Sequence, residues 1–202
     1  MKFPEFFKQV KTIKLTDPLS ETLGAFEQGE IEFRYVDIVK TAGHSCATVA
    51  GAYLSTLKAL EALYAEELPQ RGNIKVEFAD SETDGVIGVI ANVIENITGA
   101  TLIRGFKGIG GKRFIRHSLM SFDADIDGDI KFTRLDTGKS VTTSYNAQVV
   151  PPHPNQMPLM QKIMQNQASA SELDEFKTIW QNRVKQILID NFDNQQLVVV
   201  KQ

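Results

Sequence analysis

Hydrophobic residues recur three and four positions apart over residues 45–66, and this spacing predicts the strongest helix in the front half of the chain. Pro69 and Gly72 follow this segment and are typical of a helix end. The same spacing from Phe3 to Ile13 predicts a short amphipathic helix near the N-terminus. A turn at residues 17–21 leads into a second short helical piece.

A second apolar segment covers residues 84–98 and is rich in β-branched residues, which favour strands. Its length and the polar residues Asn92 and Asn96 favour a mostly buried helix, with Gly99 as its C-terminal signal. Asp84 is the expected N-cap, because its carboxylate can accept hydrogen bonds from the first free amides of a helix.

Alternation of apolar and polar residues predicts strands over residues 30–39 and 73–79. Two or three antiparallel strands are expected further along the chain, with turns at Asp127-Gly128 and at residues 136–138. These strands cover residues 118–124, 130–135 and 140–145.

Two helices are expected in the last quarter of the chain, a short one over residues 158–167 and a longer one over residues 170–190. Ser169 and Glu172 have capping-box spacing at the start of the longer helix. The apolar run at residues 197–200 predicts a strand. Without a neighbouring strand to pair with, it would form an aggregation-prone sheet edge.

These elements predict an α+β fold, in which an antiparallel or mixed sheet packs with a few helices and a helical tail follows at the C-terminus. The proline-rich segment 149–154 interrupts regular structure. We therefore divide the chain into a core of residues 1–150, which includes the N-terminal helical extension, and a tail of residues 151–202. The tail is expected to pack on the core or on a second copy of the chain.

The composition of the 202-residue chain is that of an ordinary globular protein, with 42% hydrophobic and 23% charged residues. A net charge of −3 argues against nucleic-acid binding, which needs clustered Lys and Arg. No apolar stretch approaches the length of a membrane span, and charged residues interrupt the N-terminal segment, so neither a membrane partner nor a secretory signal is expected. The single cysteine excludes an internal disulfide and fits a reducing compartment, so we expect a cytoplasmic protein.

The glycine-rich segment 105–112 (GFKGIGGK) suggests a phosphate-binding loop. A Walker A motif would need glycine at Phe106 and a hydroxyl residue at Arg113, so the motif fails. Free backbone amides at Gly110 and Gly111, beside Lys112, could still hold an anion. The alternative is that the segment is a tight connection without a ligand.

Four aspartates alternate with other residues from Asp123 to Asp129, as they do at the start of an EF-hand calcium loop. The twelfth position of such a loop should be a bidentate Glu, and it is Arg134 here. The flanking residues also alternate like strands. A turn between strands is therefore favoured over a calcium site.

His44 and Cys46 lie two residues apart immediately before the strongest predicted helix. The positive end of a helix dipole favours a thiolate, and a thiolate with a neutral imidazole suits zinc or a similar metal. His117 is the best candidate for a third ligand, and the acidic residues at positions 80, 82 and 84 could add oxygen ligands. The alternatives are a Cys–His nucleophile pair and a buried structural thiol beside a surface histidine.

Several motifs between residues 35 and 146 occur in an order that resembles the motif order of the FmdE-like family. This family takes its name from the E chain of formylmethanofuran dehydrogenase. The segment Gly43–Cys46 opens an Ala/Gly/Leu-rich helix, and an apolar helix ends in Thr-Gly-Ala-Thr at residues 98–101. The glycine-rich loop and the segment 133–139, which ends in Thr-Gly-Lys, also match the family pattern.

The resemblance implies an α+β core, an intertwined homodimer, and a metal held near the His-x-Cys segment. Only His44 and Cys46 carry over from the family's His-x-His-x-Cys-Pro-Gly pattern, because Ala42 replaces the first histidine and Ala47-Thr48 replaces Pro-Gly. Ala100 replaces a family cysteine, and the C-terminal cysteine module of some members is absent from this sequence. These departures leave few metal ligands.

Together these features predict a metal-binding FmdE-like protein that holds a divalent metal, zinc first, and serves a redox or one-carbon system as an accessory or a sensor. The expected partners are a second copy of the chain and a redox enzyme. Two alternatives stay open. The first is a metal-dependent enzyme acting on a small anionic substrate, and the second is a structural dimer without metal.

Overall fold

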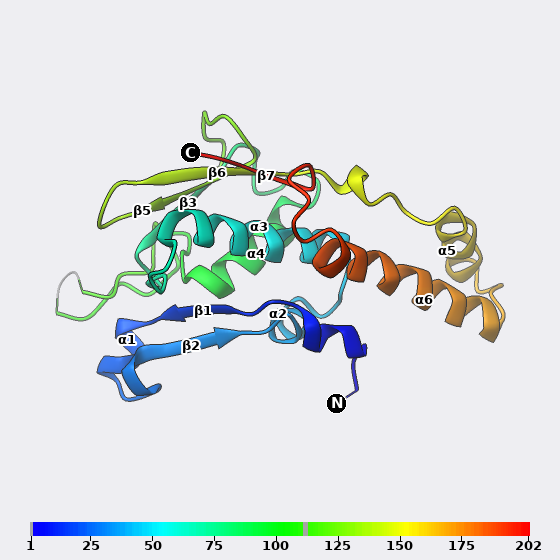
Figure 1. The fold of residues 1–202 in the computed structure, drawn as a ribbon, viewed down its shortest axis with the longest axis horizontal. Helices are drawn as coiled ribbons and strands as arrows, with labels where there is room; N and C mark the ends of the chain where they lie inside the picture. Colours follow the sequence, from blue (N-terminus) through cyan, green and yellow to red (C-terminus); the bar gives the residue numbers. More distant parts are fainter. Residues whose placement is uncertain (1, 111–112) are drawn as a thin grey trace.

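The computed structural model describes residues 2–110 and 113–202 and shows an α+β fold, which confirms the expected class (Figure 1). In Figure 1 a five-stranded sheet lies along one side, helices α3 and α4 lie beneath it, and a two-stranded sheet with α2 covers their other side. The candidate ligands His44 and Cys46 lie between α2 (Tyr35–Ala42) and α3 (Ala47–Tyr64).

The five-stranded sheet has the order β4-β3-β5-β6-β7 and is antiparallel except between β3 and β4. Its strands are β3 (Ile74–Phe78), β4 (Met120–Ser121), β5 (Ile130–Arg134), β6 (Ser140–Tyr145) and β7 (Val198–Lys201). Val76 lies opposite Phe132, and both side chains are fully buried in the hydrophobic core.

The expected hairpin through Asp127-Gly128 is wrong, because β4 pairs in parallel with β3 and does not pair with β5. The amide of Val76 donates to the carbonyl of Leu119, so β3 occupies the position beside β4. Alternation within a strand carries no information on which neighbour the strand will take.

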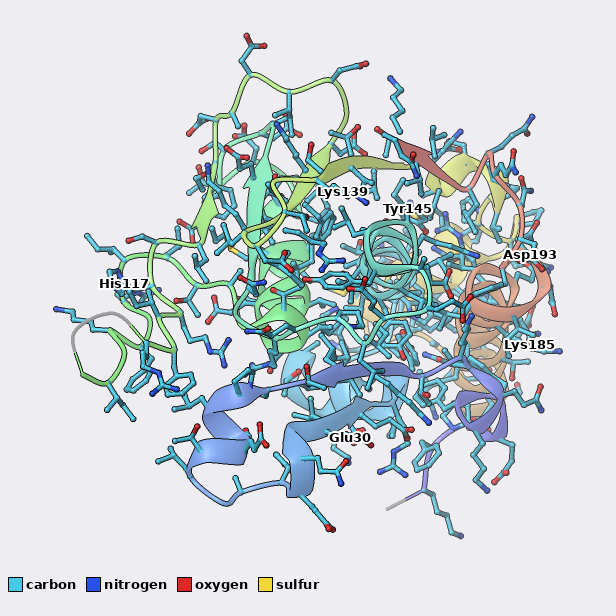
Figure 2. All side chains as sticks on the ribbon, turned by 60° about the vertical axis from the view of Figure 1, so that its left-hand side comes forward. Glu30, His117, Lys139, Tyr145, Lys185 and Asp193 are labelled. Atoms are coloured by element: carbon cyan, nitrogen blue, oxygen red, sulfur yellow. The ribbon has the colours of Figure 1, made fainter. Side chains whose placement is uncertain are left out.

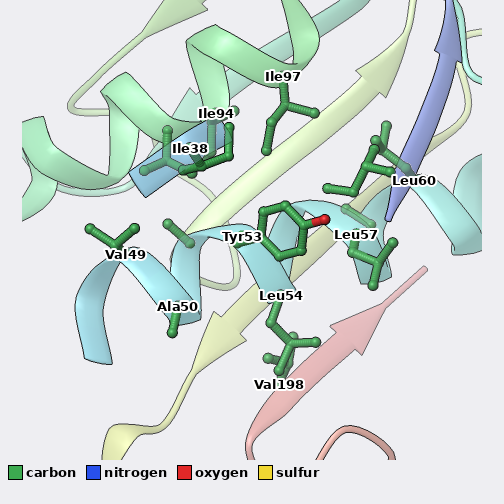
Figure 3. Packing of buried hydrophobic residues seen from close by; sticks show 14 of the residues in the cluster. Ile38, Val49, Ala50, Tyr53, Leu54, Leu57, Leu60, Ile94, Ile97 and Val198 are labelled. Atoms are coloured by element: carbon green, nitrogen blue, oxygen red, sulfur yellow. The ribbon is translucent and has the colours of Figure 1, made fainter. Parts of the chain in front are cut away.

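Helix α3 (Ala47–Tyr64) confirms the strongest helix predicted from the sequence and forms the centre of the core (Figure 3). It packs against α4 (Ile87–Thr98) on one side and against β6 and β7 on the other. Figure 3 shows Tyr53 and Leu57 of α3 among apolar side chains from α2, α4 and the sheet. Burial on several sides explains why apolar residues occupy most of the surface of this helix.

Gly51 lies where α3 meets the ring of Tyr145, and a Cβ atom at this position would overlap the ring. We expect Gly51→Ala to lower the free energy of unfolding by about 1–3 kcal/mol, because overpacking outweighs the gain of about 1 kcal/mol in helix propensity. Thermal or urea unfolding measures the change. The same substitution in a Tyr145→Ala background should not lower the free energy of unfolding further. Equal decreases in the free energy of unfolding in both backgrounds would contradict this explanation.

The start of α4 differs from the prediction. The helix begins at Ile87 with Val86 as N-cap, and no side chain provides a capping hydrogen bond. Asp84 is not the cap, because it lies in the preceding turn, where its carbonyl accepts from the amide of Ile87. Gly99 ends the helix in the left-handed conformation (φ +70°), as expected from its position.

The segment 30–39 is a strand only at its beginning, in β2 (Glu30–Phe33). It continues as helix α2 (Tyr35–Ala42), and at its start the carboxylate of Asp37 accepts from the backbone amide of Arg34 at 3.1 Å and from the Nε of Arg34 at 3.4 Å. The buried side chains of α2 are Tyr35, Val36 and Ile38, which lie on one helical face. The alternating pattern over residues 35–39 was therefore compatible with both structures, and burial against α3 and α4 favours the helix.

The predicted N-terminal helix is wrong over most of its length. A 3₁₀ helix, η1 (Glu5–Gln9), is followed by β1 (Ile13–Thr16), which pairs antiparallel with β2. The chain then turns through α1 (Pro18–Thr22) and the 3₁₀ turn η2 (Glu27–Gly29) back into β2. The pairing partner of β1 lies more than a dozen residues away, so local spacing could not reveal the strand.

The last part of the chain follows the predicted order. After the turn η3 (Ala147–Val149) come α5 (Gln156–Met164), α6 (Ala170–Lys185) and a π-helical turn, η4 (Gln186–Asp190). The capping box of Ser169 and Glu172 is confirmed. Helices α5 and α6 extend to one side of the body in Figure 1, and β7 returns to pair with β6. The boundary near residue 150 stays a prediction.

None of the helices in the described ranges is both long and apolar enough to cross a bilayer.

Candidate functional site

The loop that carries His44 and Cys46 joins α2 to α3 and is held in place from several sides. Gly43 ends α2 in the left-handed conformation (φ +76°), which turns the chain toward α3. The hydroxyl of Ser45 lies 3.0 Å from that of Tyr35, and its carbonyl accepts from the indole nitrogen of Trp180 at 2.8 Å. Helix α6 therefore helps to fix the backbone between the two candidate ligands.

Cys46 is the N-cap of α3 and is half-buried. Its sulfur accepts from the backbone amide of Val49 at 3.4 Å. The first amides of a helix place positive potential at the sulfur. This placement suits both a metal ligand and a simple helix cap.

His44 is exposed, and its Nδ1 lies 2.9 Å from the carbonyl oxygen of Ala42. A carbonyl only accepts, so Nδ1 carries the proton in this contact. The lone pair of Nε2 is then available to a ligand, which is the usual arrangement of metal-bound histidine.

His44 and Cys46 share the wall of a cavity of about 330 Å³, here called the thiol cavity. Its wall includes His44, Cys46, Thr48, Val86, Trp180 and Arg183. The guanidinium of Arg183 donates to the carbonyl oxygens of Val150 at 2.8 Å and Ala147 at 3.1 Å. Arg183 thus brings a fixed positive charge to the same wall as the sulfur.

Two tyrosines, Tyr35, which is buried, and Tyr145, which is partly buried, flank this loop and remain protonated at neutral pH. Burial raises the pKa of Tyr145 to about 12, although Arg183 acts in the opposite direction and Cys46 adds to the rise. Burial also raises the pKa of Tyr35 well above its usual range, against the lowering effect of its hydrogen bond with Ser45. The hydroxyl of Tyr145 donates to the carbonyl of Ala47, so it supports the start of α3.

A second cavity, of about 420 Å³, also has His44 in its wall and is here called the arginine cavity. Its wall includes Thr41, His44, Arg71, Asn92, Thr101 and Arg116. His44 and Val89 line both cavities, so the two cavities adjoin at these residues.

His117 lines neither of these cavities. Figure 2 shows it at one edge of the molecule, well away from Tyr145, whose hydroxyl bonds to the first residue of α3. Its Nδ1 lies 3.1 Å from the hydroxyl of its neighbour Ser118. The structure thus brings His44 and Cys46 together but does not bring His117 to them.

The other predicted ligands also lie apart from the two cavities. Asp80, Glu82 and Asp84 are exposed and line neither cavity. Gly110 is exposed with φ +59°, and Gly111 and Lys112 lie outside the described residues. Within residues 2–110 and 113–202, no group of three or more His, Cys, Asp and Glu side chains is arranged to hold a metal ion.

The residues that sequence reasoning missed are Arg71, Arg116 and Asp17. Asp17 is almost fully buried, and its carboxylate lies 3.1 Å from Nη1 of Arg71 and 2.6 Å from Nη2 of Arg116. The three side chains come from distant parts of the chain, and none belongs to a recognisable motif. No local signal in the sequence could have identified this cluster.

A scan of the chain against models of known protein families found no match, and a search of curated proteins found no relative.

Proposed function

We propose that this chain is a metal-binding protein in which Cys46 and His44 supply two ligands of an open site. The observation that carries the proposal is their shared position on the wall of the thiol cavity, with the Nε2 lone pair of His44 available and the sulfur at the start of α3. Thiolate and imidazole together suit zinc and other metals of similar softness.

Two protein donors do not fit a closed structural zinc site, which takes four protein ligands. They fit an open position that solvent, a small ligand or a second chain completes. The resemblance to the FmdE-like family supports an intertwined homodimer, and such a dimer could supply further ligands. We infer from the same resemblance an accessory or sensor role in a redox or one-carbon system, with a redox enzyme as partner, in the cytoplasm.

The metal proposal predicts a loss of bound metal in two variants. Protein purified without an affinity tag from zinc-supplemented cells should carry about one metal ion per chain, and Cys46→Ser and His44→Gln should each lose most of it. Elemental analysis measures the metal, and circular dichroism checks the fold. The metal-bound form should also react more slowly with a thiol reagent than the chelator-treated form.

His153→Gln is the matched control, because His153 lines neither cavity. It should keep the metal content of the wild type. Metal retained by Cys46→Ser would overturn the proposal, as would wild-type protein without metal. In the second case the interpretation of Cys46 as a helix cap in a structural dimer would stand.

The expected homodimer is tested separately by sedimentation. We expect a species of about twice the chain mass at micromolar concentration, and a monomer at all concentrations would contradict the assembly that the resemblance implies.

A second candidate function is an enzyme acting on a small anionic substrate. The observation that favours it is that His44 lines both the thiol cavity and the arginine cavity, since a ligand held by the arginines could extend toward His44. Turnover would need an acid or base close to the bound substrate.

A further inference from the structure

The arginine cavity is built on a buried cluster of three charges. Asp17 is 2% exposed and Arg116 is 6% exposed, and their carboxylate and guanidinium are 2.6 Å apart. Arg71, which lies between α3 and β3, completes the cluster; its side chain also donates to the carbonyls of Ile97 and Asn96 near the C-terminal end of α4. Two guanidiniums face one carboxylate, so the cluster carries one excess positive charge.

Not all N–H donors of Arg116 are paired within this cluster. Its Nη2 donates to Asp17, but its buried Nε–H has no acceptor among the residues that the structure describes. Burial lowers the pKa of Arg116, an effect that Asp17 opposes and Arg71 reinforces, yet arginine stays protonated in proteins. A buried guanidinium with an unpaired N–H is costly and needs an explanation beyond the ion pair.

The remaining wall of the cavity shows which kind of anion the two guanidiniums could hold. The side chains of Val89, Val93 and Phe106 provide an apolar surface, and the exposed amide of Asn92 is free of side-chain hydrogen bonds within the described chain. Glu95 lies on the same wall, and its carboxylate formally balances the excess positive charge of the cluster. A ligand with a single negative charge and an apolar body therefore fits better than a dianion.

We propose that the arginine cavity binds a small organic monocarboxylate, whose oxygens accept from Arg116 and Arg71 while its apolar body lies against α4 and Phe106. The planar donor fork of arginine matches a carboxylate in shape, and a volume of about 420 Å³ is in the range of small-molecule sites. The carboxylate site needs no metal, so this proposal does not depend on whether the proposed metal is bound.

The test compares phenylacetate with its neutral amide, phenylacetamide, and with inorganic phosphate, by NMR titration of chelator-treated protein. We expect phenylacetate to bind with a Kd below about 10 mM. It should bind about tenfold or more tightly than phenylacetamide, because only the carboxylate can form charge-assisted hydrogen bonds. Phosphate should bind more weakly than phenylacetate.

Asn92→Asp adds a negative charge to the wall without touching the buried cluster, and it should weaken phenylacetate binding about five- to tenfold. Asn182→Asp makes the same change at an exposed position of α6 and should leave the affinity unchanged. Cys46→Ser should also bind phenylacetate like the wild type, which separates this site from the metal proposal. The inference is overturned if phenylacetate does not bind, if acid and amide bind alike, if phosphate binds more tightly, or if Asn92→Asp binds like the wild type.

Discussion

Asp17→Asn is expected to lower the free energy of unfolding by about 3–5 kcal/mol, because it leaves two guanidiniums beside a neutral side chain in a buried position. Asn keeps the shape of Asp and can still accept from the amides of Leu19 and Ser20 at the start of α1. The substitution therefore removes the charge and preserves the helix cap. Urea unfolding followed by circular dichroism measures the loss.

Asp174→Asn is the matched control, because Asp174 pairs with Lys177 on the surface of α6 with both side chains exposed. Surface pairs of this kind contribute little to stability, so the control should unfold like the wild type. Adding Arg116→Met to Asp17→Asn should recover part of the lost stability, since it removes the buried charge that was left unpaired. A loss below about 1 kcal/mol in Asp17→Asn would contradict this explanation of the cluster.

Phe132→Ala is expected to lower the free energy of unfolding by about 3–5 kcal/mol, the usual range for deleting a buried aromatic ring. Phe132 is fully buried in β5, the central strand of the five-stranded sheet, with Val76 and Val141 as its neighbours across the strands. Loss of the ring removes apolar burial and leaves a cavity that fixed strands on both sides cannot fill. Chemical unfolding with a two-state fit measures the change.

Phe26→Ala makes the same substitution at a ring that is 47% exposed and should change stability far less. The two variants together separate burial from side-chain type. If both lost the same stability, the assignment of Phe132 to the core would be wrong.

The core and the ion cluster differ in what the sequence could reveal. Helix α3 could be predicted from the sequence because apolar residues recur three and four positions apart over five turns, a spacing that no strand gives. The same reasoning located α4 and the capping box of α6. Each of these features depends on residues at most a few positions apart.

The candidate site could be predicted only in part, because only some of its residues are close together in the sequence. His44 and Cys46 are two residues apart, and the helix that follows them places both at one cavity. His117 was chosen by elimination among three histidines, and long-range packing decides the position of such a residue. The arginine cavity depends on Asp17, Arg71 and Arg116. The first and the last of these residues are 99 positions apart in the sequence.

Local patterns were sufficient to establish the α+β class, the long buried helices and the proximity of one imidazole to the single thiol, because short-range periodicity and spacing govern all three. Long-range packing decided that β4 runs parallel to β3, that residues 35–42 form α2, and that two arginines meet at a buried aspartate. Those outcomes depend on which distant surfaces exclude water together, and no stretch of neighbouring residues encodes that choice.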